Sequence, residues 1–125
     1  MYNIEFYETA SGNSDILDFL ESLRTKIASS KDARIQYKQV VRYIQLLEDN
    51  GTSLPEVIVK HLEGDLWELR PGHNRIFFFC FWNDTFVLLH HFRKKTQKTP
   101  RREIEQAVSE MKDYISRKES KDELE

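Results

Sequence analysis

The chain contains a single cysteine, Cys80, among its 125 residues. One cysteine excludes a disulfide framework, and no spacing of His and Cys typical of a zinc site accompanies it. Because Cys80 lies within an apolar run, we expect a buried and unreactive thiol. The sequence also lacks a glycine-rich phosphate loop and the Gly-x-Ser-x-Gly motif of a nucleophilic serine. These absences predict a protein that works without a metal ion or a cofactor.

Long hydrophobic runs are also missing. The longest, residues 76–82, has the length of a buried strand and is too short to cross a membrane. The first ten residues include Glu5 and Glu8 but no basic residue, so no signal peptide is recognised. The chain length fits one domain, and 39% hydrophobic residues supply a modest core. We therefore expect a single cytoplasmic domain that does not enter a membrane.

The apolar periodicity predicts a strand, then two helices, near the N-terminus. Residues 2–7 alternate as a half-buried strand does. Helical spacing of apolar residues begins after Ser14, a suitable N-cap, and returns over about residues 32–49. We expect these helices to form a hairpin packed on a sheet. A last helix should follow Thr99 as its N-cap, with Pro100 in the first helical position.

The middle of the chain predicts an antiparallel meander. Short turns rich in Pro, Gly, Asn and Asp separate three strand-like runs at residues 66–70, 76–82 and 85–92, and residues 57–62 suggest a further edge strand. We expect an α+β fold of two layers, with the helices on one side of the sheet. The domain should span residues 1–115. Residues 116–125 are highly charged and are expected to form a flexible tail.

Positive charge is concentrated in one segment. Residues 90–102 carry six basic residues and no acidic one, which leaves 13 of the 19 basic residues against all 21 acidic ones elsewhere. Such a segment on an otherwise acidic protein indicates a local anion-binding site. Together with Phe92, the basic side chains of Arg93 and Lys98 suit RNA, since cations bind phosphates and an aromatic face can stack on a base.

Strand alternation suggests further candidates. In residues 66–70 it directs Glu68 and Arg70 toward the uncovered face of the sheet, where Arg70 could bind phosphate or pair with a carboxylate such as Glu63. Arg75 begins an apolar strand, so it either reaches solvent or lines a groove. In residues 85–94 the alternation places His90 and His91 on opposite faces. A histidine at a strand end is either structural or an acid–base group.

The same alternation makes a specific prediction about side-chain partners. His90 should share its face with Phe86, Leu88, Phe92 and Lys94, and His91 should share the other face with Val87, Leu89 and Arg93.

The stretches LWELR (66–70), RIFF (75–78) and LLHHFRKKTQKTPRREIEQA (88–107) resemble the RelE/HigB superfamily of toxins from bacterial type II toxin–antitoxin systems, and most closely its phage-related HigB branch. The resemblance covers roughly residues 1–115. It implies a RelE-like α+β fold, with a small antiparallel sheet, two N-terminal helices and one C-terminal helix. It also implies ribosome-dependent, metal-independent cleavage of messenger RNA. The implied partners are a helix-turn-helix, HigA-like antitoxin and, through the toxin–antitoxin complex, operator DNA.

The resemblance also implies a site. The positions that match catalytic ones are Arg70, Arg75, His90, Lys94 and Lys95, while Phe92 and Lys98 fall in the matching RNA-binding segment. His91 departs from the family pattern, in which a small residue is usual, so either histidine could be the functional one. Tyr114 lies near the C-terminus, where some RelE members use a tyrosine, but no motif connects it to that role. Two alternatives are a ParE-like toxin that poisons DNA gyrase and an inactive phage-derived binding or regulatory protein.

Overall fold

The computed structural model describes the backbone of residues 1–124 and the side chains of residues 1–121. The elements follow in the order β1 (Asn3–Phe6), α1 (Asp15–Arg24), α2 (Lys31–Asn50), the short 3-10 helix η1 (Gly51–Ser53), β2 (Val59–Glu63), β3 (Leu66–Leu69), β4 (Asn74–Phe81), β5 (Thr85–Arg93) and α3 (Arg101–Leu124). The predicted α+β class and the predicted number and order of the long helices are confirmed. The architecture is RelE-like.

The five strands form one sheet in the order β1-β5-β4-β3-β2. Strands β2 to β5 are antiparallel neighbours, as the meander prediction required. Strand β1, however, pairs in parallel with β5, so the sheet is mixed and not wholly antiparallel. Alternation identified β1 as a strand, but its partner and direction depend on where the chain enters the fold, which a local pattern does not encode.

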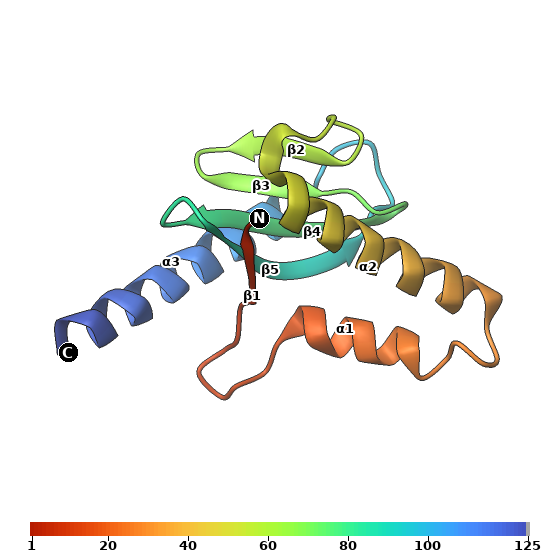
Figure 1. The fold of residues 1–125 in the computed structure, drawn as a ribbon, viewed down its shortest axis with the longest axis horizontal. Coiled ribbons are helices and arrows are strands. Elements are labelled where there is room, and N and C mark those ends of the chain that lie inside the picture. The colour runs from red at the N-terminus through yellow and green to blue at the C-terminus, as the bar shows by residue number, and fades with distance from the viewer. Residues whose placement is uncertain (125) are drawn as a thin grey trace.

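Helices cover both faces of the sheet (Figure 1). Helices α1 and α2 pack on one face through a cluster that includes Ile16, Val40 and Phe78. Helix α3 packs on the opposite face, where Ala107 belongs to a cluster with Phe79. The prediction of two layers with helices on one side is therefore wrong. The continuous apolar run of β4 is the physical reason, because a strand with apolar residues on both faces needs cover on both.

A bulge in β5 changes the predicted side-chain faces. Ile76 pairs with His91 but Phe78 pairs with Leu88, so two residues of β5 face only Phe77 of β4. As a result Phe86 and Leu88 lie in the core beneath α1 and α2, whereas Phe92 lies in the α3 core with Val87 and Leu89. The predicted grouping of Phe86, Leu88, His90 and Phe92 on one face is wrong for this reason.

The helix ends agree in part with the sequence. The Ser14 hydroxyl accepts a hydrogen bond from the Leu17 amide and caps α1, as predicted. Helix α3 begins at Arg101, and the Pro100 carbonyl accepts the first helical hydrogen bonds, so Thr99 is not its N-cap. The Thr99 hydroxyl instead donates to Glu68.

One further expectation is corrected at an exposed position. Cys80 is exposed, because it lies near the end of β4. Helix α3 continues to Leu124, so the charged segment after residue 115 is helical as far as it is described, and Glu125 lies outside the described residues. No helix in the described part of the chain combines the length and apolarity needed to span a bilayer.

Candidate functional site

Four of the five predicted catalytic residues gather at one end of the sheet. Arg75 at the start of β4 and Lys94 and Lys95 after the end of β5 line a groove, which we call the cationic groove; its other lining residues are His73, Thr96 and Gln97. The Lys94 amide donates a hydrogen bond of 2.7 Å to the His73 carbonyl, which fastens the two sides together. The fourth residue, Arg70, approaches from the end of β3.

A buried carboxylate lies among these cations. Glu68 of β3 is only 2% exposed, and its Oε1 atom is 3.5 Å from Nε of Arg70 and 3.6 Å from Nε of Arg75. Both Nε atoms are buried, and neither has a hydrogen-bond partner among the described residues. Other guanidinium nitrogens are engaged, since Arg70 donates to the Glu56 carbonyl and Arg75 donates to the carbonyls of Gly72 and Asn74. The ion pair expected as one alternative for Arg70 is present, with Glu68 in place of Glu63.

The closeness of these cations affects the pKa of Arg75 and of Lys94. Burial lowers the pKa of Arg75, and the positive charge of Arg70 lowers it further, although Glu68 opposes this. The pKa of Lys94 is also lowered, by partial burial and then by Arg75 and Arg70. A lysine with a lowered pKa beside two guanidinium groups is suited to both anion binding and proton transfer.

The predicted RNA-binding residues lie in and beyond an adjoining groove. Lys95 and Thr96 line both grooves, and the adjoining one also includes Phe92 and Arg93. Phe92 is 9% exposed and stacks on Phe77, so only its edge can meet a ligand. Arg93 donates to Gln36 of α2. Lys98 is exposed in the loop between β5 and α3 and lines neither of these two grooves.

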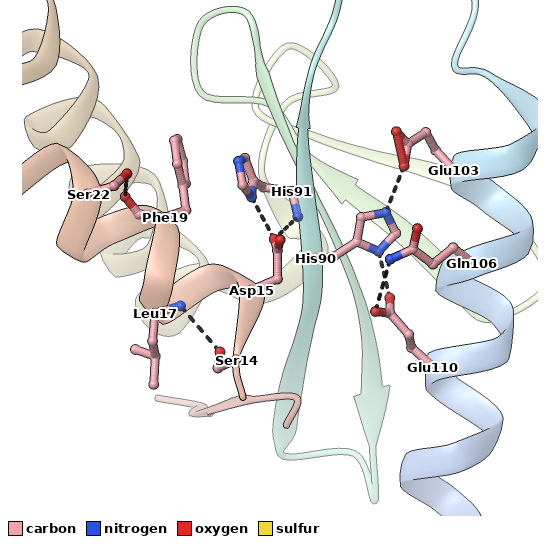
Figure 2. Close-up of polar contacts among 10 residues, drawn as sticks. All are labelled: Ser14, Asp15, Leu17, Phe19, Ser22, His90, His91, Glu103, Gln106 and Glu110. Carbon is pink, nitrogen blue, oxygen red and sulfur yellow. Dashed lines mark hydrogen bonds and ion pairs between the residues drawn. The ribbon is translucent and has the colours of Figure 1, made fainter. Parts of the chain in front are cut away.

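His90 does not line the cationic groove and instead points toward Glu103 and Glu110 of helix α3 (Figure 2). Its Nδ1 lies 2.6 Å from Glu110 and its Nε2 lies 3.1 Å from Glu103, while the whole residue is 2% exposed. Burial opposes a charge on the ring, but the two carboxylates outweigh it and raise the pKa of His90. Because both ring nitrogens are engaged, this geometry argues against the acid–base role expected for His90. It favours a structural role.

His91 points to the opposite side of β5 from His90, as predicted, and lies against α1 (Figure 2). The prediction that it shares a face with Val87 and Leu89 is wrong, because these two residues lie in the α3 core. Its ring Nδ1 and its backbone amide both contact one carboxylate oxygen of Asp15, at 2.6 and 2.8 Å. Its ring also stacks on Phe19 with centroids 3.8 Å apart. These contacts join α1 to the sheet, so His91 has a clear packing role.

Tyr114 lies far along α3 from the cationic groove. It is 8% exposed, donates a 2.6 Å hydrogen bond to Glu5 and packs edge-on against Phe79 and Phe81. Tyr114 lies thirteen positions after Arg101, which corresponds to about 20 Å along the helix axis. Tyr114 therefore supports the contact between α3 and β1 and does not belong to the groove.

Four residues of the site were not predicted from the sequence: His73, Thr96 and Gln97 in the cationic groove and Thr99 as a partner of Glu68. The sequence pattern placed Thr99 only at the start of a helix. The adjacency of the 71–74 turn to Arg75 was the available signal for His73. For Thr99 no local signal existed, because its partner Glu68 is 31 residues away. Among the described residues, no group of three or more His, Cys, Asp or Glu side chains is placed to hold a metal ion.

The fold and the groove define a small α+β domain with a cationic site at one end of its sheet. Comparison with protein families identifies the group: the profile of the phage-derived Gp49-like proteins (DUF891) matches residues 19–112, and the chain belongs to this family. This is a toxin-like family related to RelE. None of the curated proteins matches the chain significantly.

Proposed function

We propose that this chain is the toxin of a type II toxin–antitoxin system and inhibits translation by cutting messenger RNA on the ribosome. The observation that carries the proposal is that Arg75 and Lys94 line one groove, with Arg70 beside Arg75 on the shared carboxylate of Glu68, and that the pKa of Lys94 is lowered. Membership in a toxin-like family supports it. The resemblance of residues 88–107 to the phage-related HigB branch supports the finer assignment.

The groove contains the groups that RNA cleavage without a metal requires. Lys94, in its neutral form, would take the proton of the ribose 2′-OH. The 2′-oxygen then attacks phosphorus, the bond from phosphorus to the 5′-oxygen breaks, and a 2′,3′-cyclic phosphate remains. Arg75 and Arg70, with Lys95 beside them, would stabilise the extra negative charge of the transition state.

The leaving 5′-oxygen needs a proton, and we assign its donor to His73 in place of His90. His73 is exposed and lines the groove with Lys94, and histidine is the side chain that most often serves as a general acid or base. His90 then holds α3 against the sheet. The groove is open and shallow, which suits a substrate that is positioned by a second macromolecule. We assign this positioning to the ribosome.

The proposed partners follow from the same assignment. A helix-turn-helix, HigA-like antitoxin would neutralise the toxin in the cytoplasm, and the two together would bind operator DNA. Phe92, Arg93 and Lys98 would contact RNA outside the reacting phosphate, with Phe92 contributing its exposed edge only.

The test is a cell-free translation reaction with the purified protein, in which messenger RNA ends are mapped by primer extension with and without ribosomes. We expect new ends only when wild-type protein and ribosomes are both present. Lys94→Ala should reduce the rate of cleavage at least a hundredfold, because a general base typically contributes about a hundredfold or more to the rate. Lys112→Ala is the matched control, because it removes an exposed lysine from α3 at a distance from the groove.

Intact message with normal translation would overturn the ribonuclease proposal. A gyrase supercoiling assay would then distinguish the ParE-like alternative, and harmless expression without an antitoxin would favour an inactive binding protein. Equal loss of activity in Lys94→Ala and Lys112→Ala would remove the cationic groove from the mechanism.

A further inference from the structure

Glu68 is an unusual residue for its position. It lies in β3 between apolar neighbours and is 2% exposed, and burying a carboxylate is costly unless cations or hydrogen bonds surround it. Its partners are Arg75 of the cationic groove, the neighbouring Arg70 and the hydroxyl of Thr99. No partner serves only the core, so packing alone does not explain why a carboxylate stands here.

We propose that Glu68 is the positioning residue of the cationic groove: it holds the two guanidinium groups in place and, through Thr99, fastens the loop that carries Lys94 and Lys95. This inference rests on the proposed function and deepens it. Glu68 touches neither the substrate nor the reacting atoms in this scheme; it acts through Arg70, Arg75 and the loop.

The strand register explains how one carboxylate reaches both arginines. Glu68 pairs with Phe77 of β4, and side chains two residues apart on a strand share a face. Arg75 stands two residues before Phe77, and Arg70 stands two residues after Glu68. The carboxylate therefore lies close to both guanidinium groups, where it offsets their mutual repulsion.

The loop between β5 and α3 is fastened at both ends near this site. At its start the Lys94 amide donates to the His73 carbonyl at 2.7 Å, and at its end the Thr99 hydroxyl donates to Oε2 of Glu68 at 3.1 Å. Residues 95–98 between these points are exposed. Loss of the Thr99 contact should release the loop and let Lys95 leave the groove.

Glu68 also acts on Lys94 through charge. The groups that affect Lys94 come from three strands: Arg75 of β4, Arg70 at the end of β3 and Lys60 of β2 lower its pKa, and only Glu68 raises it. Removing the negative charge of Glu68 while keeping its shape should lower the pKa of Lys94 further. If Lys94 is the base, the acidic limb of the pH–rate profile then moves to lower pH.

Two variants separate these effects. Glu68→Gln keeps the side-chain shape and an acceptor for Thr99 but removes the charge, so we expect at least tenfold slower cleavage and an acidic limb at lower pH. Thr99→Val removes the hydroxyl, so we expect about tenfold faster hydrogen exchange of the amides in residues 94–99, with no shift of the pH profile. Glu105→Gln, which removes an exposed carboxylate of α3, is the matched control for charge.

A purely structural role for Glu68 would lower the melting temperature without moving the pH profile, and that result overturns the inference. If the amides of residues 94–99 exchange hydrogen equally fast in Thr99→Val and in the wild type, Thr99 does not hold the loop in place. If the wild-type protein cuts no RNA, the proposed function fails by itself. Two measurements then decide whether Glu68 organises the groove. The first is hydrogen exchange of the loop in Thr99→Val. The second is the affinity of Glu68→Gln for a 2′-deoxy oligonucleotide, which we expect to change at least threefold.

Discussion

Nδ1 of His90 lies 2.6 Å from a carboxylate oxygen of Glu110, across the interface between β5 and α3. A second carboxylate, that of Glu103, approaches the other ring nitrogen at 3.1 Å. A ring held on both sides by carboxylates is most stable when both nitrogens carry protons. The packing of α3 on the sheet therefore depends on the charge of one buried histidine.

The first prediction concerns the pH dependence of stability. The folded state raises the pKa of His90 above its ordinary value of 6.5, so its contribution is fully present below pH 6.5 and is lost as the pH rises through the folded pKa. We expect His90→Asn to lower the free energy of unfolding by about 2 kcal/mol at pH 6 and by clearly less at pH 9. Urea unfolding at the two pH values measures this. An equal loss at both would show that the ring is neutral.

The second prediction concerns Asp15 on the other face. Burial opposes its charge, but hydrogen bonds from the ring and backbone of His91 lower the pKa of Asp15. Its contribution is therefore present above its unfolded pKa of about 3.9 and is lost as the pH falls through the folded pKa. Asp15→Ala should cost about 1 kcal/mol at pH 7, a value reduced by solvent screening, and less at pH 3.

Asp18→Ala is the matched control for this prediction. Both residues lie in the first turn of α1, so both interact with the helix dipole. Only Asp15 contacts His91. Guanidinium unfolding curves for the two variants isolate the contact, and equal losses would assign the whole effect to the dipole.

The third prediction concerns the salt dependence of RNA binding. Lys95 lines both grooves and is exposed, so it is placed to contact phosphate. Lys95→Ala should reduce the slope of log K against log salt by about 0.7, the value for one phosphate contact on a single strand. Fluorescence anisotropy with a 2′-deoxy oligonucleotide at several salt concentrations measures the slope. If Lys112→Ala gives the same reduction, binding is spread over the surface and the groove has no special part in it.

The fourth prediction concerns the core. Phe78 is fully buried beneath α1 and α2, whereas Trp82 is 73% exposed at the tip of the β4–β5 hairpin. Phe78→Ala should cost about 3–5 kcal/mol because it leaves a cavity, and Trp82→Ala should change stability by less than about 1 kcal/mol. Thermal unfolding followed by circular dichroism compares the two. A large loss in Trp82→Ala would reveal that its stacking on Phe81 supports the hairpin.

Local patterns predicted most of the elements correctly and indicated several residues of the candidate site. The periodicity that identified α2 and the alternation that identified β1 and β5 are properties of neighbouring residues, and the structure confirms them. The basic segment likewise indicated where Lys94 and Lys95 would lie. Arg70 and Arg75 joined them because the turn between β3 and β4 is short and brings the two strand ends together.

The predictions that the structure corrects share one physical cause, since each depends on contacts between residues far apart in the sequence. A β-bulge opposite Phe77 reverses the alternation of β5, and it depends on how two strands pair. The parallel partner of β1 and the position of α3 on the second face likewise depend on long-range packing. The two carboxylates that α3 brings to His90 were likewise not visible in any local pattern.

The sequence by itself determined the class of fold, the order of the elements and the concentration of positive charge after β5, since each follows from residues close together in the chain. Only the tertiary structure decided which histidine is enclosed, which face α3 covers and which cations converge on Glu68. These depend on contacts between residues far apart in the sequence, such as Glu68 with Thr99 and His90 with Glu110. Such contacts exist only after the sheet and its two helical layers have packed together.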